Sequence, residues 1–328
     1  MTRPAKTPPL SQSFHQRLWG PLFIAPWLIG FLTLVVYPFA ASFYWSFCRY
    51  DLLSSPRWIG TENYQRLAEE LISSRDFGQA VWNTTYYALL SVPLSIALGV
   101  GLAVILSWKV RGQAVYRTVF FLPSVVPVVA SSVLWLWLLD PQDGLVNYVT
   151  GLTADRALWF KGAGESAWLP SWIGSDWNLL GPRFGSKDGL VLMSLWGVGN
   201  FMIIYLAAIG DIPRQLHEAA ELDGAGRFRR FLHITLPMLT PVIFFNLVMG
   251  LIQSVQAFTQ VYIVSEGTGE PAGSTLVLSL HLFLAAFQDL DMGYASAMAW
   301  VLFVILLVCT AVLFRSSRHW VHYQGMRG

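Results

Sequence analysis

Long apolar runs separated by short charged segments dominate the chain. Six of them are about as long as the 20 residues that a helix needs to cross the hydrocarbon core of a bilayer. They occupy residues 21–45, 82–106, 119–139, 190–209, 241–264 and 294–314, and none contains Lys, Arg, Asp or Glu. A charged side chain at the centre of such a helix costs about 2.5–3.5 kcal/mol. The pattern therefore predicts an all-α integral membrane protein with six transmembrane helices.

The charges between these runs predict an orientation. With the N-terminus inside, the inner segments hold 13 of the 21 Lys and Arg residues but only 4 of the 19 Asp and Glu residues. Cytoplasmic loops are enriched in Lys and Arg, so we expect both termini in the cytoplasm. This gives a cytoplasmic arm (1–20), a membrane domain (21–314) and a cytoplasmic tail (315–328), with an inner loop at 211–240. The outer loops then lie at about 46–81, 140–189 and 265–293.

Composition agrees with a membrane environment. The chain is 55% hydrophobic and 12% charged, and its net charge of +2 is too small to indicate nucleic-acid binding. Two cysteines, Cys48 and Cys309, indicate neither a disulfide framework nor a zinc site, and the histidines show no metal-ligand spacing. The first run resembles the start of a secretory signal peptide, but its length of about 25 residues exceeds the 7–15 of a cleaved apolar region.

Prolines and tryptophans leave open interpretations. Five prolines fall inside the predicted helices and either kink them around a cavity or are tolerated because neighbouring helices satisfy the freed carbonyls; they are Pro26, Pro38, Pro93, Pro123 and Pro127. Four tryptophans lie in the second outer loop, where the usual role is anchoring at the membrane interface and the alternative is ligand binding; they are Trp159, Trp168, Trp172 and Trp177.

The inner loop at 211–240 predicts two short helices. The first runs from Asp211 to Gly224, with Asp211 as a candidate cap, Pro213 in the first turn and Gly224 as a left-handed stop. The second runs from Arg227 to Ile234. On the first of these helices, Ala219 and Ala220 leave a flat surface that a partner can approach closely. Two short helices joined at a glycine form a stiff knob that can transmit displacement.

Polar residues inside the spans are candidates for a solute path, because such residues usually face the bundle interior or a wet cavity. On the fifth predicted helix, Asn246, Gln253, Gln256 and Gln260 fall within an arc of about 80°. Phe258 adds a stacking surface beside these amides. Weaker candidates on the fourth span are Trp196, Asn200 and Tyr205. The alternative is that the amides join helices to one another by hydrogen bonds, a common use of Asn and Gln in membranes.

The spacing Glu-Ala-Ala, three residues, Gly, nine residues, Ile-x-Leu-Pro resembles the cytoplasmic EAA motif of ATP-binding-cassette (ABC) importer permeases. The motif residues here are Glu218, Ala219, Ala220, Asp223, Gly224, Ile234, Leu236 and Pro237. Further landmarks resemble the first permease of maltose-type and glycerol-phosphate-type importers, among them Trp58-Ile59-Gly60, Glu62-Asn63-Tyr64, Leu122-Pro123 and Met292-Gly293-Tyr294. Two departures lie in predicted outer segments, at residues 266–271 and in an apparent insertion at 151–187.

This resemblance implies an ABC importer type I permease fold in the cytoplasmic (inner) membrane. It also implies a subunit that forms half of the pathway for a sugar or sugar derivative. Its partners are then membrane lipid, a second permease, an ABC ATPase dimer gripped by the 218–237 loop, and an extracytoplasmic solute-binding protein. The chain has no Gly-x4-Gly-Lys-Ser/Thr phosphate loop, so a partner is expected to hydrolyse ATP, and no cofactor is expected here. The alternatives are a permease for a solute such as glycerol-3-phosphate, a secondary transporter, and a membrane enzyme.

Overall fold

The computed structural model describes residues 14–73, 76–108, 111–140, 186–270 and 273–322, with the isolated positions 145 and 149. These parts are built from helices, with one short antiparallel ladder in which β1 (Cys48–Arg49) pairs with β2 (Arg57–Trp58). Most of the predicted arm, residues 151–185 of the predicted insertion with its four tryptophans, and the end of the predicted tail lie outside the described residues.

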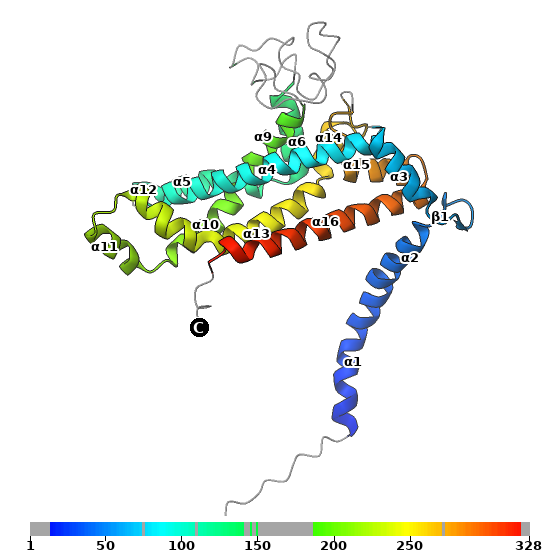
Figure 1. The fold of residues 1–328 in the computed structure, drawn as a ribbon, viewed down its shortest axis with the longest axis horizontal. Coiled ribbons are helices and arrows are strands. Elements are labelled where there is room, and N and C mark those ends of the chain that lie inside the picture. The colour runs from blue at the N-terminus through cyan, green and yellow to red at the C-terminus, as the bar shows by residue number, and fades with distance from the viewer. Residues whose placement is uncertain are drawn as a thin grey trace, which may run out of the picture.

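The N-terminal helices project away from the rest of the described chain (Figure 1). α1 (Phe14–Phe31), η1 (Leu32–Val36) and α2 (Tyr37–Trp45) follow one another without a break, and no part of the apolar stretch Leu22–Trp45 is buried within the chain. Only the far end of this stretch packs on another helix. There the Phe39 and Phe43 rings contact Trp300, whose indole Nε1 donates to the Ser42 hydroxyl at 3.3 Å.

Two π-helical turns have the same cause. Pro38 and Pro237 each stand second in a helix and have no N–H to donate. Just before each proline, the hydrogen-bond ladder shifts by one residue: the Tyr37 N–H donates to the Leu32 carbonyl, and the Leu236 N–H donates to the Phe231 carbonyl. The first shift forms η1 and the second forms η3 (Phe231–Thr235).

The long helix α4 (Asp76–Ser107) is the centre of the bundle and packs against α9, α10, α13 and α15 (Figure 1). It contains the second predicted span, and Pro93 lies inside it without ending it. α3 (Glu62–Ile72) precedes it and is amphipathic. Small and polar side chains of α4 are buried against its neighbours, including Ala80, Asn83 and Ala103.

Two of the predicted spans are bent. The third consists of α5 (Gln113–Phe121), the 3₁₀ turn η2 (Leu122–Val125) and α6 (Val128–Leu138), with a bend of 98°. Val126 precedes Pro127 and is extended, as the residue before a proline prefers to be. The fourth consists of α9 (Ser186–Trp196) and α10 (Gly199–Gly210), bent by 46°. A Cβ on Gly199 would lie 2.2 Å from the Phe120 carbonyl oxygen, so the backbones of α10 and α5 are in direct contact at this point.

The fifth predicted span is not one continuous helix, and this part of the prediction is wrong. α13 (Leu236–Val255) ends before Gln256, and α14 (Thr259–Val264) starts afresh. The Ala257 carbonyl, in the break, accepts a hydrogen bond from the Ser279 hydroxyl. Gln256 and Gln260 therefore do not continue the helical face of Asn246 and Gln253.

The last helices complete the bundle. α15 (Leu278–Phe287) is an apolar helix within the predicted outer loop 265–293, and it packs on α16 (Met292–Trp320) and α4. At the start of α16, Arg66 from α3 bonds to Glu70 and to Asp291, each at 3.0 Å. A Cβ on Gly293 would lie 2.1 Å from the Cys48 carbonyl oxygen. These contacts fasten α3 and the β-ladder to α16.

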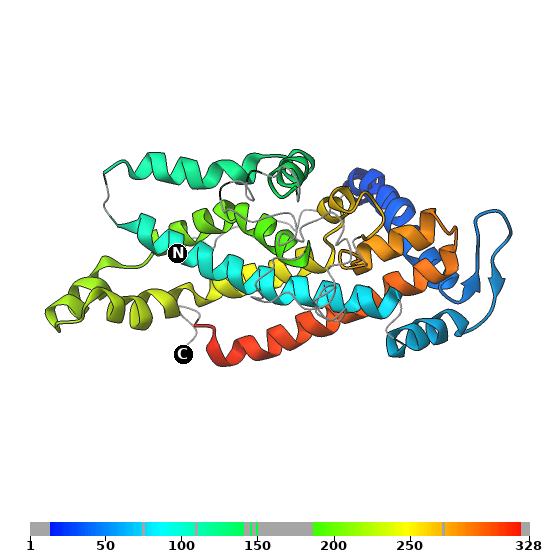
Figure 2. The same cartoon turned by 90° about the horizontal axis from the view of Figure 1, so that it is seen from above.

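Four helical stretches are long and apolar enough to cross a membrane, and there are six if each bent pair counts as one span, taking the described residues alone. The loop between α10 and α13 lies at one end of the molecule, and α3 with the β-ladder lies at the other (Figure 2). We call these the loop end and the ladder end.

Candidate functional site

The loop that joins α10 to α13 contains the first predicted short helix, α11 (Arg214–Leu222). The second predicted helix, Arg227–Ile234, is not a separate short helix, because α12 (Arg227–Arg230) continues through η3 into α13 as one helix, Arg227–Val255. Gly224 has a φ of +76°, which confirms the predicted left-handed stop. The Ala225 N–H donates to the Ala220 carbonyl and the Gly224 N–H to the Glu221 carbonyl, which together form a Schellman motif. The predicted Asp211 cap is wrong, because α11 begins after Pro213 and has no side-chain cap.

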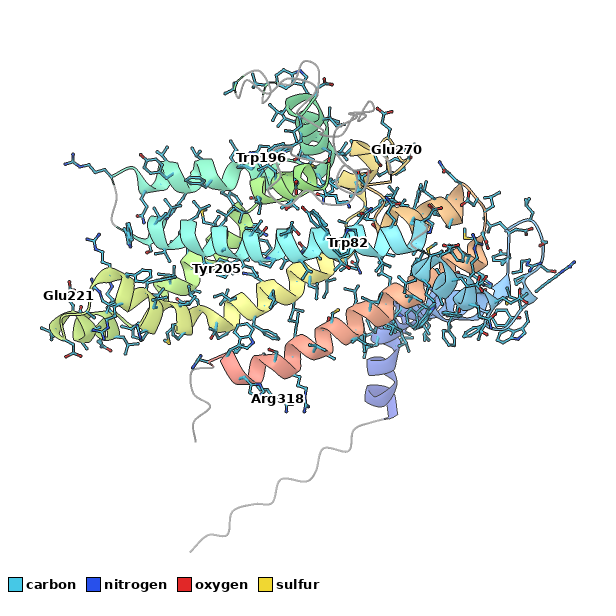
Figure 3. All side chains as sticks on the ribbon, turned by 45° about the horizontal axis from the view of Figure 1, so that its top comes forward. Trp82, Trp196, Tyr205, Glu221, Glu270 and Arg318 are labelled. Atoms are coloured by element: carbon cyan, nitrogen blue, oxygen red, sulfur yellow. The ribbon has the colours of Figure 1, made fainter. Side chains whose placement is uncertain are left out.

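Two contacts brace this loop. Across the Gly224 turn, Arg230 Nη1 lies 3.1 Å from Glu221 Oε2. The Arg227 guanidinium lies 5.6 Å from the centre of the Trp108 ring, just beyond the end of α4, within the range of a cation–π contact. Glu218 and Ala219 on α11 remain exposed, and Glu221 lies near the tip of the loop (Figure 3). The loop is therefore tied to α12 and to the end of α4, and part of its motif is exposed.

The motif residues divide into two groups in space. Glu218, Ala219, Ala220, Asp223 and Gly224 form the exposed helix and its turn. Ile234, in η3, and Leu236 and Pro237, at the start of α13, lie where the chain leaves the loop. The second group is half-buried. The motif thus spans both the exposed part of the loop and its attachment to the bundle.

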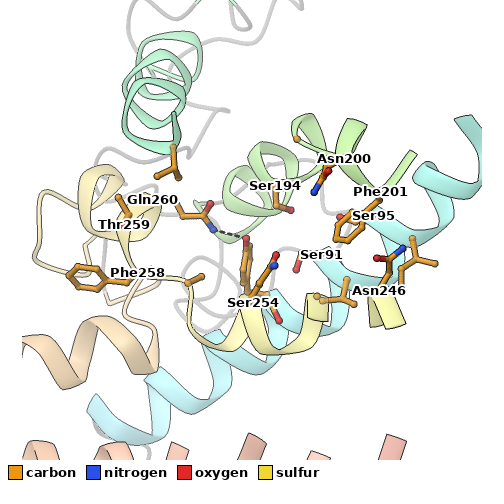
Figure 4. Close-up of a pocket in the computed structure, with 18 residues that line it drawn as sticks. Ser91, Ser95, Ser194, Asn200, Phe201, Asn246, Ser254, Phe258, Thr259 and Gln260 are labelled. Carbon is orange, nitrogen blue, oxygen red and sulfur yellow. Dashed lines mark hydrogen bonds between the residues drawn. The ribbon is translucent and has the colours of Figure 1, made fainter. Parts of the chain in front are cut away.

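A cavity of about 370 Å³ lies among α4, α9, α10, α13 and α14 (Figure 4). This volume is in the usual range for small-molecule sites, about 300–1,000 Å³. The lining mixes polar and apolar side chains and carries no Asp, Glu, Lys, Arg or His. It is formed by Tyr87, Ser91, Val92, Ser95, Ile96, Val128, Ser194, Gly197, Asn200, Phe201, Asn246, Gly250, Gln253, Ser254, Ala257, Phe258, Thr259 and Gln260.

The polar groups of the cavity differ in what they can offer a ligand. Gln260 Nε2 donates to the Tyr87 hydroxyl at 2.6 Å, which joins α14 to α4. The Ser194 and Ser254 hydroxyls donate to carbonyls of their own helices, so their oxygens remain available as acceptors. Asn246 is 1% exposed, and its Nδ2 has no hydrogen-bond partner in the protein. A neutral ligand with many hydroxyl groups fits this set of donors and acceptors.

The structure brings five of the eight candidate path residues together in this cavity: Asn200, Asn246, Gln253, Phe258 and Gln260. The other three do not line it. Gln256 is exposed in the break after α13. The Trp196 ring packs against Trp135 at 6.1 Å, nearly edge to face. Tyr205 is fully buried among apolar side chains on the loop-end side of the cavity.

Sequence reasoning missed the contribution of α4. Tyr87, Ser91 and Ser95 recur every four residues and so lie on one face of this helix. The same spacing is visible in the sequence, but serine is small and common inside membrane helices, where its hydroxyl can bond to its own helix.

In the part of the chain that the structure describes, no group of three or more His, Cys, Asp or Glu is arranged to hold a metal ion.

The family profile and the related sequences that match this chain agree on one protein family. The profile of the family described as binding-protein-dependent transport system inner membrane component matches residues 95–321. The probable ABC transporter permease protein YesP of Bacillus subtilis is 40% identical over 94% of this chain and 93% of its own length. The sulfoquinovosyl glycerol transport system permease protein SmoG of Agrobacterium fabrum is 32% identical over 92% of this chain and 91% of its own length. The lactose transport system permease protein LacF of Rhizobium radiobacter is 33% identical over 91% of this chain and 94% of its own length.

Solved structures show the same fold. A chain from the crystal structure of a bacterial ABC transporter involved in the import of the acidic polysaccharide alginate superposes with a TM-score of 0.72. The likeness covers 94% of this chain and 98% of that chain at 23% identity. A second structure, of the bacterial alginate transporter in complex with an alginate pentasaccharide-bound periplasmic protein, gives a TM-score of 0.70.

Proposed function

The chain belongs to the binding-protein-dependent transport system inner membrane components, the permease subunits of ABC importers, and we propose that it forms half of the pathway for a sugar. It is a membrane subunit of a transporter and not an enzyme. The alternatives of a secondary transporter and a membrane enzyme therefore fall away. We propose the identity of the solute, the partner proteins, the membrane topology and the roles of individual residues.

The uncharged polar cavity is the observation that supports a sugar. Hydroxyl groups of a sugar can pair with the amides and serine oxygens of the cavity, and Phe201 and Phe258 offer apolar surface beside them. Relatives named for lactose and for trehalose and maltose are 33% and 31% identical to this chain. A relative named for sn-glycerol-3-phosphate is 28% identical. The anion that it carries would find no Lys, Arg or His on this cavity wall, so we favour the sugar.

We assign coupling to the loop between α10 and α13. ATP is hydrolysed on a separate ABC ATPase dimer, which grips the exposed side of α11 and displaces the loop. The Arg230–Glu221 ion pair and the Arg227–Trp108 contact support this assignment, since they let the loop move as a unit with the end of α4. The residues proposed for coupling are Glu218, Ala219, Ala220, Asp223, Gly224, Ile234, Leu236 and Pro237.

In the membrane, we propose six spans with both termini in the cytoplasm. The two bent helix pairs each count as one span, and the distribution of Lys and Arg supports the orientation. The loop end then faces the cytoplasm, and the ladder end faces an extracytoplasmic solute-binding protein. A second permease completes the pathway.

Reconstitution of the complete importer tests the sugar assignment. The chain is co-expressed with its partner subunits, purified as a complex through a tag on this chain, and placed in proteoliposomes containing ATP. Radiolabelled lactose, maltose, diacetylchitobiose and sn-glycerol-3-phosphate are then offered with the binding protein. We expect uptake of a neutral sugar that depends on ATP and on the binding protein. Uptake of glycerol-3-phosphate alone, or uptake without the ATPase, would contradict the proposal.

A further inference from the structure

The lining of the cavity stops at the same level on three helices. Toward the loop end, the last lining residues are Ile96 on α4, Phe201 on α10 and Asn246 on α13. One turn further toward the loop end, α4 carries Gly99 and α10 carries Tyr205. Figure 3 shows Tyr205 between Glu221, at the loop end, and Trp82, toward the ladder end. Whatever leaves the cavity toward the loop end must pass this level.

An apolar cluster fills the bundle between that level and the loop end. Its buried members are Val100, Ala103, Leu106, Met202, Tyr205 and Leu239. Tyr205 is the largest of them and is fully buried. Its ring fills the space that a side chain at position 99 would need, because a Cβ on Gly99 would lie 3.1 Å from Tyr205 Cε2. The Tyr205 ring therefore fills the space between α4 and α10 on the loop-end side of the cavity.

Two polar atoms at this boundary lack partners within the protein. They are the Tyr205 hydroxyl and Asn246 Nδ2, both in side chains no more than 1% exposed. The hydroxyl lies beside the Asn246 amide but forms no hydrogen bond of normal geometry with it. A buried donor left unpaired costs free energy. The Asn246 side chain lines the cavity (Figure 4), so its buried Nδ2 would gain a partner if the amide turned toward a solute there.

We propose that Asn246 is the deepest solute-binding side chain of the cavity and that Tyr205 is the gate beneath it. Asn246 Nδ2 donates to a hydroxyl of the bound sugar. The Tyr205 ring keeps the sugar from the loop end until α10 and α13 separate. This inference rests on the proposed function, because it takes the cavity as part of the solute pathway.

Accessibility of a cysteine at position 246 tests the gate without knowledge of the solute. Asn246→Cys is introduced with Cys48→Ser and Cys309→Ser into the full transporter. Membrane vesicles of both orientations are treated with a membrane-impermeant thiol reagent. We expect the cysteine to be protected from the loop end when Tyr205 is present. It should become reactive from that end when Tyr205→Ala is added.

A matched control separates opening from general loosening. Leu280 on α15 is as deeply buried as Tyr205 but belongs to a different cluster near the ladder end. Leu280→Ala should leave the cysteine protected from the loop end. Protection that persists with Tyr205→Ala, or equal exposure with Leu280→Ala, overturns the gate. If the cysteine at position 246 is labelled from neither side in any nucleotide state, the cavity is not part of the solute pathway. This result would contradict the proposed function as well.

Isosteric variants test the two polar atoms. If Asn246 and Tyr205 only pack, Asn246→Leu and Tyr205→Phe remove unpaired polar atoms and leave transport and assembly unchanged or improved. If Asn246 binds the sugar, Asn246→Leu lowers the maximum uptake rate by about 2- to 13-fold, the value of one hydrogen bond. The concentration of loaded binding protein that gives half-maximal uptake stays the same. The probe is whichever of radiolabelled lactose or maltose the unaltered complex carries, and an unchanged uptake rate in Asn246→Leu overturns the role of Asn246.

Discussion

At the scale of single residues, the backbone conformation of Gly224 was predicted correctly from the sequence. The left-handed stop at Gly224 follows from a local pattern, a helical segment ending at a glycine, and the structure gives it a φ of +76°. Gly226, two residues later, has an ordinary φ of −66°. Neither residue has another group within 4 Å of an added Cβ. The two glycines thus differ in backbone conformation and not in available space.

This difference makes Gly224→Ala and Gly226→Ala a matched pair. Only the first forces a side chain into the left-handed region, at a cost of about 1 kcal/mol. We expect Gly224→Ala to lower solute-stimulated ATPase activity and uptake, because the Schellman turn that shapes the loop weakens. Gly226→Ala should leave both unchanged. Equal activity of the two variants in proteoliposomes would contradict a role for the turn geometry.

Candidate path residues were only partly predictable. Polarity within an apolar span correctly marked Asn246 and Gln253, since both lie on α13 and line the cavity. Gln256 was placed on the same face because the helix was taken as continuous. Serines 91 and 95 were missed because a serine in a membrane helix satisfies its own hydroxyl, so the sequence alone does not distinguish a lining serine from a packing one.

At the scale of elements, the presence of the apolar runs was predictable but their internal breaks were not. The bend at Pro127 follows from proline chemistry. The break after Val255 has no proline or glycine between residues 253 and 260. It is stabilised by distant groups, with Ser279 bonding to the Ala257 carbonyl and Tyr87 accepting from Gln260. Such tertiary partners leave no local mark in the sequence, and α15, with ten residues, is too short to register as a span.

Close backbone approach at the ladder end gives a prediction for an element. A Cβ on Gly293 would lie 2.1 Å from the Cys48 carbonyl oxygen, whereas one on Gly101 of α4 meets nothing within 4 Å. Gly293→Ala must push the β-ladder away from α16, at a cost of about 1–3 kcal/mol. Gly101→Ala should be neutral or stabilise α4 by up to about 1 kcal/mol. Thermal unfolding of the purified complex measures both, and equal midpoints would show that the contact is absent.

At the scale of the whole molecule, the most unusual feature is the exposure of the first apolar stretch. The other long helices contain buried residues, but none of the residues of Leu22–Trp45 is buried within the chain. The apolar helices of the described residues, with each bent pair counted as one, overlap the six runs predicted from the sequence, but the fifth lies at Arg227–Val255 and not at 241–264. Orientation rests on the division of 13 against 8 basic residues, which no contact within one chain can test.

Labelling of single cysteines tests this orientation. Gln215 on α11 and Thr268 in the turn after α14 are both exposed. In a background with Cys48→Ser and Cys309→Ser, we expect Thr268→Cys to react with an impermeant maleimide in intact spheroplasts. Gln215→Cys should react only after permeabilisation. Reaction of both from the same side would rule out the proposed number of spans between them.

The central claim is that this subunit couples its pathway to a separate ATPase through the loop between α10 and α13. Photo-crosslinking from position 219 tests it most directly, because Ala219 is exposed on α11. A benzophenone amino acid is placed at Ala219 and, as a control, at Thr268, and the adducts formed in native membranes are identified by mass spectrometry. We predict that position 219 captures a polypeptide with a Gly-x4-Gly-Lys-Ser/Thr phosphate loop and that position 268 does not. Capture of that ATPase from position 268, or its absence at position 219 in an assembled and active importer, would contradict the account.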